Sequence, residues 1–158
     1  IVSNQLKQFS IKIKKYNLDK RVYVIPHYDD AELAKLCAKA RAFIHPHFEA
    51  FGLAALEAAG HGLPIIIPEK SGVTEQFVNG IHGFFPKKVT IKEYKKYIVQ
   101  LLANERFAYK MGQSAWELVK EKYSWKENVK NLLYIVESSL THSTSSGLML
   151  SEVEALKI

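Results

Sequence analysis

Residues 44–64 read IHPHFEAFGLAALEAAGHGLP, and the interpretation of the rest of the chain starts from this stretch. An apolar strand ends at His45 and Pro46, and a helix of small residues begins around Gly52. The first N–H groups of a helix have no partner and carry partial positive charge, so they attract phosphate or carboxylate. Gly52 has no Cβ and lets a ligand approach this backbone closely. The stretch therefore predicts an anion site where the helix begins.

Two carboxylates bracket the predicted helix start. Glu49 falls in the turn before the helix, and Glu57 lies one to two turns inside it. Residues three and four apart share a helix face, so Glu57 could point along the same side as the opening. Such an arrangement would suit a sugar diphosphate, which has both phosphate and hydroxyl groups. Spacing alone favours a plainer interpretation, an ordinary helix packed on a sheet with exposed glutamates.

Composition indicates one domain. With 158 residues, of which 47% are hydrophobic, the chain can bury one core but not two sizeable ones. A formal net charge of +6 favours anionic partners. Cys37 is the only cysteine, so no intrachain disulfide can form, which fits a reducing cytosol. The sequence shows no secretory signal and no bilayer-spanning stretch. We therefore expect a cytoplasmic protein, and the missing initial Met suggests a fragment.

Strand and helix patterns alternate along the chain. The predicted strands are residues 21–25, 42–44, 65–67 and 83–85. One predicted helix starts at a capping box of Asp29 and Glu32 and runs to Ala40, and another starts near Gly52. The other predicted helices are residues 2–16, 71–78, 91–103, 105–123 and 125–140. This alternation predicts an α/β fold with a Rossmann-like, doubly wound parallel sheet, whose ligands bind at the carboxyl ends of the strands.

Several motifs resemble one enzyme family. The order E-A-F-G-L-A-A-L-E-A-A-G-H-G-L-P at residues 49–64 closely resembles the E-x-F-G-L…E-A…G-x-P signature of retaining nucleotide-sugar glycosyltransferases of family 4, which have the GT-B fold of two Rossmann-like domains. S-G-V-T-E at 71–75 stands where the family usually has G-G-x-x-E, with Ser71 replacing the first glycine. Three shorter segments also match motifs of this family: N-G-I-H-G-F at 79–84, M-G at 111–112 and Y-S-W at 123–125. The resemblance runs from Leu18 to Leu140.

The resemblance implies a role for each residue around the helix start. Glu49 would contact the donor sugar hydroxyls as the catalytic-site carboxylate. The backbone of Phe51, Gly52 and Leu53 would hold the sugar and phosphate, and Glu57 would bind the ribose. The reaction would be sugar transfer with retained anomeric configuration, without a cofactor or a bound metal. Residues 1–140 would then be a partial donor-binding domain of the GT-B C-terminal type, and residues 141–158 a tail.

Three other features have competing interpretations. Tyr28 follows the predicted strand at 21–25, where the family contacts the nucleotide base. That Tyr28 is simply an aromatic residue on the surface of a loop is an equally good interpretation. His45 and His47 alternate around Pro46 but lack the further ligands that a metal site needs. The lysines of residues 87–96 fall on a predicted helix with an apolar side, which favours a solvated face over nucleic-acid binding.

The family comparison also indicates missing parts. In the family, the first strand of this domain is followed by an Arg and a Lys that grip the diphosphate, and no such segment precedes Ile1. We expect the sheet to be incomplete at its N-terminus and the N-terminal acceptor domain to be absent. The favoured interpretation is the donor-binding part of a glycosyltransferase, with a nucleotide sugar as partner. The alternatives are a non-catalytic sugar-nucleotide binding module and a structural fragment. Peripheral membrane contact stays open, without a motif to support it.

Overall fold

The computed structural model describes the backbone of residues 2–143 and the side chains of residues 6–124 and 126–139. Most of the predicted tail, residues 144–158, lies outside the described residues. The chain divides into two compact units, Ile1–Lys39 and Ala40–Ile158, and each is treated by itself below. Among the described residues, no helix combines the length and apolarity needed to cross a bilayer.

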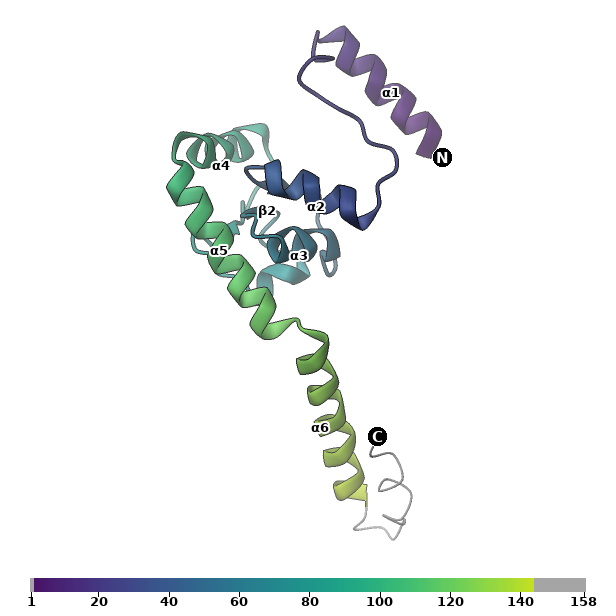
Figure 1. The fold of residues 1–158 in the computed structure, drawn as a ribbon, viewed down its shortest axis with the longest axis vertical. Helices are drawn as coiled ribbons and strands as arrows, with labels where there is room; N and C mark the ends of the chain where they lie inside the picture. The colour runs from purple at the N-terminus through teal and green to yellow at the C-terminus, as the bar shows by residue number, and fades with distance from the viewer. Residues whose placement is uncertain (1, 144–158) are drawn as a thin grey trace. The chain divides into compact units, whose positions relative to one another are not determined.

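The first unit contains two helices, α1 (Val2–Lys15) and α2 (Asp30–Lys39) (Figure 1). The predicted capping box begins α2: the Glu32 N–H donates to Asp29 Oδ1 at 2.8 Å, and the Asp29 N–H donates to Glu32 Oε2 at 3.2 Å. This reciprocal pair satisfies two N–H groups that a helix start otherwise leaves without partners. Both predicted helices of this unit are confirmed.

The predicted strand at residues 21–25 is wrong. The N–H groups of Arg21 and Val22 both donate to the Leu18 carbonyl in a turn, and the rest of the segment forms no strand in the described structure. Tyr23 is 78% exposed. β-Branched and aromatic residues favour a strand only where a neighbouring strand completes the hydrogen-bond ladder, and here the ladder is missing.

The second unit is built on a parallel sheet of three short strands, β1 (Phe43–Ile44), β2 (Ile65–Ile66) and β3 (Gly83–Phe84), in the order β1-β2-β3. Phe43 pairs with Ile65, and Ile65 pairs with Gly83. The isoleucines of β2 are fully buried, as an all-apolar strand in the middle of a parallel sheet should be. The sequence located all three strands correctly, although each is shorter than predicted.

Helices follow each strand of the second unit. They are α3 (Leu53–Gly60), the 3-10 turn η1 (Gly72–Glu75), α4 (Ile91–Ala103), α5 (Glu105–Lys122) and α6 (Trp125–Ser143). α3 packs against β1, β2 and α5, and α5 also contacts α4 and β3 (Figure 1). α4 and α5 begin where the sequence predicts, at the N-caps Thr90 and Asn104. The α/β fold with a parallel sheet is confirmed.

The predicted helix at residues 71–78 is wrong in type and length. Only the single turn of η1 forms, closed by the Thr74 N–H donating to the Ser71 carbonyl at 2.9 Å. The Thr74 hydroxyl also donates to the carbonyls of Ser71 and Glu69. Beyond the turn, the Val78 N–H donates to His82 Nδ1 at 2.8 Å, so it is not available to continue a helix. Local side-chain bonds of this kind compete with helix formation.

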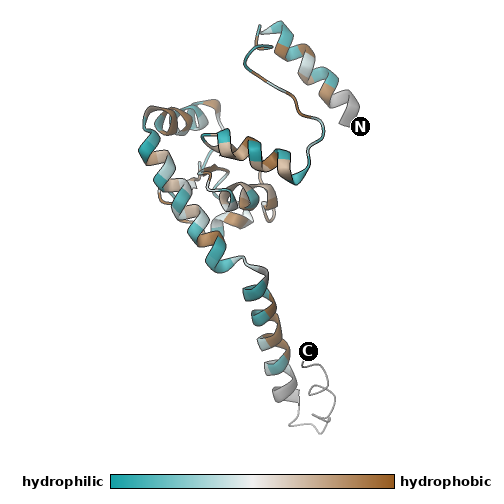
Figure 2. Cartoon of the chain, in the orientation of Figure 1, coloured by the Kyte–Doolittle hydropathy of each residue, from teal (hydrophilic) through white to brown (hydrophobic). Residues whose placement is uncertain are grey.

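One glycine sets how closely α5 approaches the end of α3. A Cβ on Gly112 would lie 2.0 Å from the Gly62 carbonyl oxygen, so only glycine fits here. The apolar side of α5 lies against a core to which β2, β3 and α4 contribute Ile66, Phe84, Tyr94 and Leu101. α6 keeps large apolar side chains exposed, among them Val129, Leu132, Leu133, Ile135 and Val136, and its apolar residues appear in brown in Figure 2.

Candidate functional site

α3 begins at a glycine, as the sequence predicts. Gly52 is its N-cap, in a left-handed conformation with φ 90° and ψ 45°. The backbone conformation favours glycine, and a Cβ at this position would crowd Val73 Cγ1 at 3.1 Å. No side chain of the described structure caps α3. The backbone N–H groups of its first turn are therefore left to bind an anion.

The turn that carries Glu49 is held by the loop at η1. The Glu49 N–H donates to Ser71 Oγ at 3.4 Å, and the Glu49 carbonyl accepts from the Gly72 N–H at 3.0 Å. Ser71 is 1% exposed, and a Cβ on Gly72 would lie 2.1 Å from the Ala50 carbonyl oxygen. The serine that replaces the family's first glycine thus uses its hydroxyl to support the Glu49 backbone.

The Glu49 side chain lies beside an imidazole. His45 Nε2 and Glu49 Oε1 are 2.9 Å apart, and the pair is an ion pair when the imidazole is protonated. Nε2 is shielded from solvent and has no partner with hydrogen-bond geometry among the described residues. The contact is therefore close but poorly aligned for a hydrogen bond. Glu49 remains about half exposed, so its carboxylate also faces solvent.

His45 is itself fixed from two sides. Its N–H donates to the Ile66 carbonyl at 2.9 Å, and its carbonyl accepts from the Tyr94 hydroxyl at 3.1 Å. Burial raises the pKa of the Tyr94 hydroxyl above its ordinary value, so this donor stays protonated further into the alkaline range. β2 and α4 thus fix the backbone of His45 at the carboxyl end of β1.

These groups enclose a small cavity of about 140 Å³, lined by His45, Glu49, Gly52, Leu53, Ala54, Ala55 and Ile67. It combines a carboxylate, an imidazole and the N-terminus of α3. It lies where β1 and β2 end, the edge at which parallel α/β sheets bind ligands. Whole-ligand clefts usually measure roughly 300–1,000 Å³, so this cavity can hold only part of a ligand.

The structure brings together some of the predicted site residues and not others. Glu49, Gly52 and Leu53 line the cavity, whereas Phe51 is exposed in the adjoining turn and does not line it. Glu57 is exposed on α3 and does not line it either. Tyr28 lies in the first unit, in a loop, with an exposed side chain.

Sequence reasoning did not identify how Glu49 is held. The sequence predicts no partner for the Glu49 side chain at His45, and Ser71 stands out only as a departure from the family pattern. It gives no sign that Tyr94 belongs to the site. The four-residue spacing of His45 and Glu49 could have suggested their contact. Nothing local could have indicated Tyr94, which lies 49 residues from His45. In the described part of the chain, no three His, Cys, Asp or Glu side chains are grouped to hold a metal ion.

Comparisons with known proteins agree on one family. Residues 3–118 match the family model described as glycosyl transferases group 1. A sucrose synthase from Melioribacter roseus is 32% identical over 143 residues, which are 84% of this chain and 18% of that protein. The alpha-1,3/1,6-mannosyltransferase ALG2 of Dictyostelium discoideum is 28% identical over 133 residues, 84% of this chain and 31% of that protein. The chain spans less than a third of the length of these two relatives.

Solved structures share the fold. Sucrose-phosphate synthase from Thermosynechococcus elongatus superposes with a TM-score of 0.76 at 22% identity, over 89% of this chain and 35% of that one. The C-terminal domain of a glycosyl transferase group 1 family protein from Francisella tularensis gives 0.62 at 25% identity, over 77% of this chain and 64% of that one. Anabaena HepE, solved with UDP and glucose, gives a TM-score of 0.73 at 18% identity, over 86% of this chain and 37% of that one. The α/β fold of this chain is thus the one found in GT-B glycosyltransferases.

Proposed function

Because this chain belongs to the glycosyl transferase group 1 family, we propose that it is the donor-binding part of a retaining glycosyltransferase of family 4. The relatives reported above are enzymes that transfer sugars, which supports a transferase activity for the protein that contains this chain. Two structural neighbours were solved with UDP, one of them together with glucose, which supports a nucleotide sugar as the donor.

The observation that carries this proposal is the position of Glu49. Its carboxylate lies beside the open N-terminus of α3, next to a cavity at the carboxyl ends of β1 and β2. In the proposed complex, Glu49 accepts hydrogen bonds from the donor sugar hydroxyls. The backbone of residues 51–53 binds the sugar and phosphate. The exposed carboxylate of Glu57 is available for the ribose, and we assign the base to Tyr28.

The chemistry proposed for these residues is positioning and charge stabilisation. The N-terminus of α3 carries partial positive charge and would stabilise the diphosphate as it departs. Glu49, held by His45 and Ser71, would orient the sugar for attack by the acceptor. We propose that the reaction retains the anomeric configuration and needs no bound metal or other cofactor. We also propose a cytoplasmic protein, in which residues 1–140 form the partial donor domain and an N-terminal domain binds the acceptor.

The test uses the full-length protein that contains this chain. We expect Glu49→Ala to abolish sugar transfer, because the donor sugar loses the carboxylate that orients it. The fold should survive, because Glu49 uses its backbone, and not its side chain, to bind Ser71 and Gly72. Product formation from UDP-, GDP- and ADP-sugars is the readout, and NMR of the product gives the anomeric configuration. Wild-type turnover in Glu49→Ala would refute the assignment.

Donor binding by the chain alone separates the alternatives. Calorimetry with the same nucleotide sugars should show at best weak binding, since the cavity of about 140 Å³ at Glu49 can hold only part of such a ligand. Submicromolar binding would instead favour a self-sufficient sugar-nucleotide binding module. A molecular mass that rises with concentration would favour a structural fragment that associates with other chains.

A further inference from the structure

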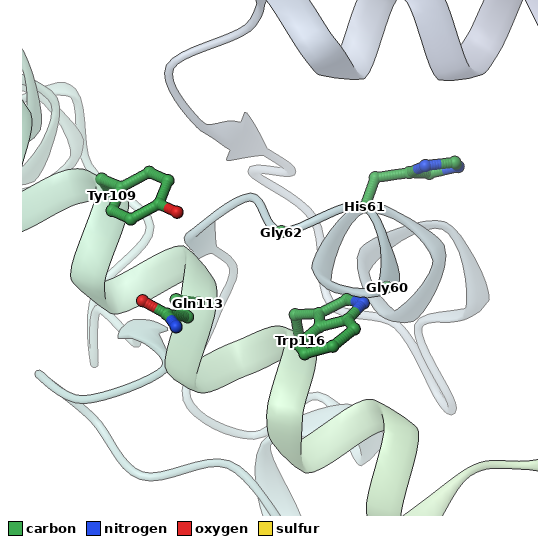
Figure 3. Close-up of a pocket in the computed structure, with 6 residues that line it drawn as sticks. All are labelled: Gly60, His61, Gly62, Tyr109, Gln113 and Trp116. Carbon is green, nitrogen blue, oxygen red and sulfur yellow. The ribbon is translucent and has the colours of Figure 1, made fainter.

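A second pocket, lined by aromatic and polar side chains, lies at the other end of α3. It measures about 430 Å³ and is lined by Gly60, His61, Gly62, Tyr109, Gln113 and Trp116. Figure 3 shows the Trp116 ring of α5 beside Gly60, Tyr109 and Gln113 further along the same helix, and the His61 ring pointing away from α5. This pocket shares no residue with the cavity at Glu49. The two lie toward opposite ends of α3, an eight-residue helix that is about 12 Å long at 1.5 Å per residue.

The aromatic side chains of this pocket are unusually open. Tyr109 is 69% exposed and Trp116 is 40% exposed, while the neighbouring Ala108, Met111 and Ala115 of the same helix are buried. Tyr109, Gln113 and Trp116 follow an i, i+4, i+7 spacing, which puts them on one face of α5. Lys120 Nζ lies 5.0 Å from the centre of the Trp116 ring, a cation–π contact that helps to hold the ring in place. A preordered ring loses less entropy when a ligand packs on it.

The polar groups of the pocket are available to a ligand. In the described part of the chain, no hydrogen bond engages the side chains of His61, Tyr109, Gln113 or Trp116. Together they offer hydroxyl, amide, imidazole and indole groups that donate or accept. The volume falls within the range of roughly 300–1,000 Å³ that ligand clefts span.

We propose that this pocket binds a sugar ring of an oligosaccharide, at a site separate from the donor cavity. A sugar ring has C–H faces that pack on aromatic rings and equatorial hydroxyls that need both donors and acceptors at the rim, and the pocket supplies both. Gln113 is exposed, so its amide can exchange hydrogen bonds to water for hydrogen bonds to sugar hydroxyls. The choice of sugar as ligand class rests on the proposed function, whereas the presence of an open aromatic pocket does not. Such a site would hold a glycan chain on the enzyme during successive sugar transfers at the donor cavity.

The test is binding of neutral gluco- and manno-oligosaccharides to the whole chain, first on an array and then by calorimetry. We expect Tyr109→Ala and Trp116→Ala each to weaken binding by about tenfold or more, because each removes one stacking surface. Tyr134→Ala on α6 is the matched control: Tyr134 is 71% exposed, as open as Tyr109, but lies outside the pocket. It should change affinity by less than about twofold.

Two further readouts place the ligand. The chain has two tryptophans, so its NMR spectrum has two indole N–H signals, and only that of Trp116 should shift with oligosaccharide. Excess UDP-glucose should not displace the sugar. The inference is overturned if no oligosaccharide binds, if Tyr134→Ala weakens binding as much as Tyr109→Ala, or if UDP-glucose competes. Oligosaccharide binding that persists in a full-length protein without transferase activity would instead count against the proposed function alone.

Discussion

Replacing Gly52 by alanine tests how the start of α3 is built. The substitution adds a methyl group at a residue with φ 90°, which costs about 1–2 kcal/mol for any residue with a Cβ. The new Cβ would also lie 3.1 Å from Val73 Cγ1, in a well-packed region, which adds about 1 kcal/mol. We therefore expect Gly52→Ala to lower the free energy of unfolding by about 2–3 kcal/mol.

Gly80→Ala is the matched control for this prediction. Gly80 has φ 83°, but a Cβ there meets no atom within 4 Å. It should therefore cost only the backbone part, about 1–2 kcal/mol. Both substitutions reduce the entropy of the unfolded chain to the same extent, so this contribution cancels in the comparison. The difference between the two variants isolates the contact with Val73.

Urea unfolding followed by far-ultraviolet circular dichroism measures both variants. In a Val73→Ala background the extra cost of Gly52→Ala should disappear, because the crowding methyl is gone, and a double-mutant cycle reports this coupling. Equal destabilisation by Gly52→Ala and Gly80→Ala would refute the steric argument. If neither variant lost stability, the argument from backbone conformation would fail as well.

Two further substitutions test the packing of α5 and the tyrosine behind the site. Gly112→Ala would place a Cβ 2.0 Å from the Gly62 carbonyl oxygen, so we expect the free energy of unfolding to fall by about 3 kcal/mol. This loss would appear as a lower urea midpoint. An unchanged midpoint would mean that α5 can move away at no cost. Tyr94→Phe removes the hydrogen bond to the His45 carbonyl and should cost about 1 kcal/mol at neutral pH. Because burial raises the Tyr94 pKa, its stabilisation is complete below the unfolded pKa of about 10 and is lost as pH rises through the folded pKa. Urea midpoints measured across alkaline pH should thus fall less steeply in Tyr94→Phe than in the wild type, and parallel curves would contradict this.

Local signals predicted most of the helices, with residues 71–78 the exception. The residue range of α4 matches its prediction, and the capping box of Asp29 and Glu32 marks the start of α2. Both rest on apolar periodicity or side-chain bonds within a few residues, which a short segment contains in full. The error at residues 21–25 has the opposite cause. Its β-branched residues fit a strand, but a strand forms only with a partner from elsewhere in the chain.

The candidate site divides in the same way. That a helix begins at Gly52 and that Glu49 precedes it could be predicted from the sequence, because both depend on residues that are neighbours in the chain. That Ser71 supports the Glu49 backbone and that Tyr94 holds His45 in place became visible only in the folded chain. The folded chain also shows that Glu57 does not line the cavity. These contacts join separate elements, and their geometry follows from how α3 and α4 pack on the sheet, which no local pattern encodes.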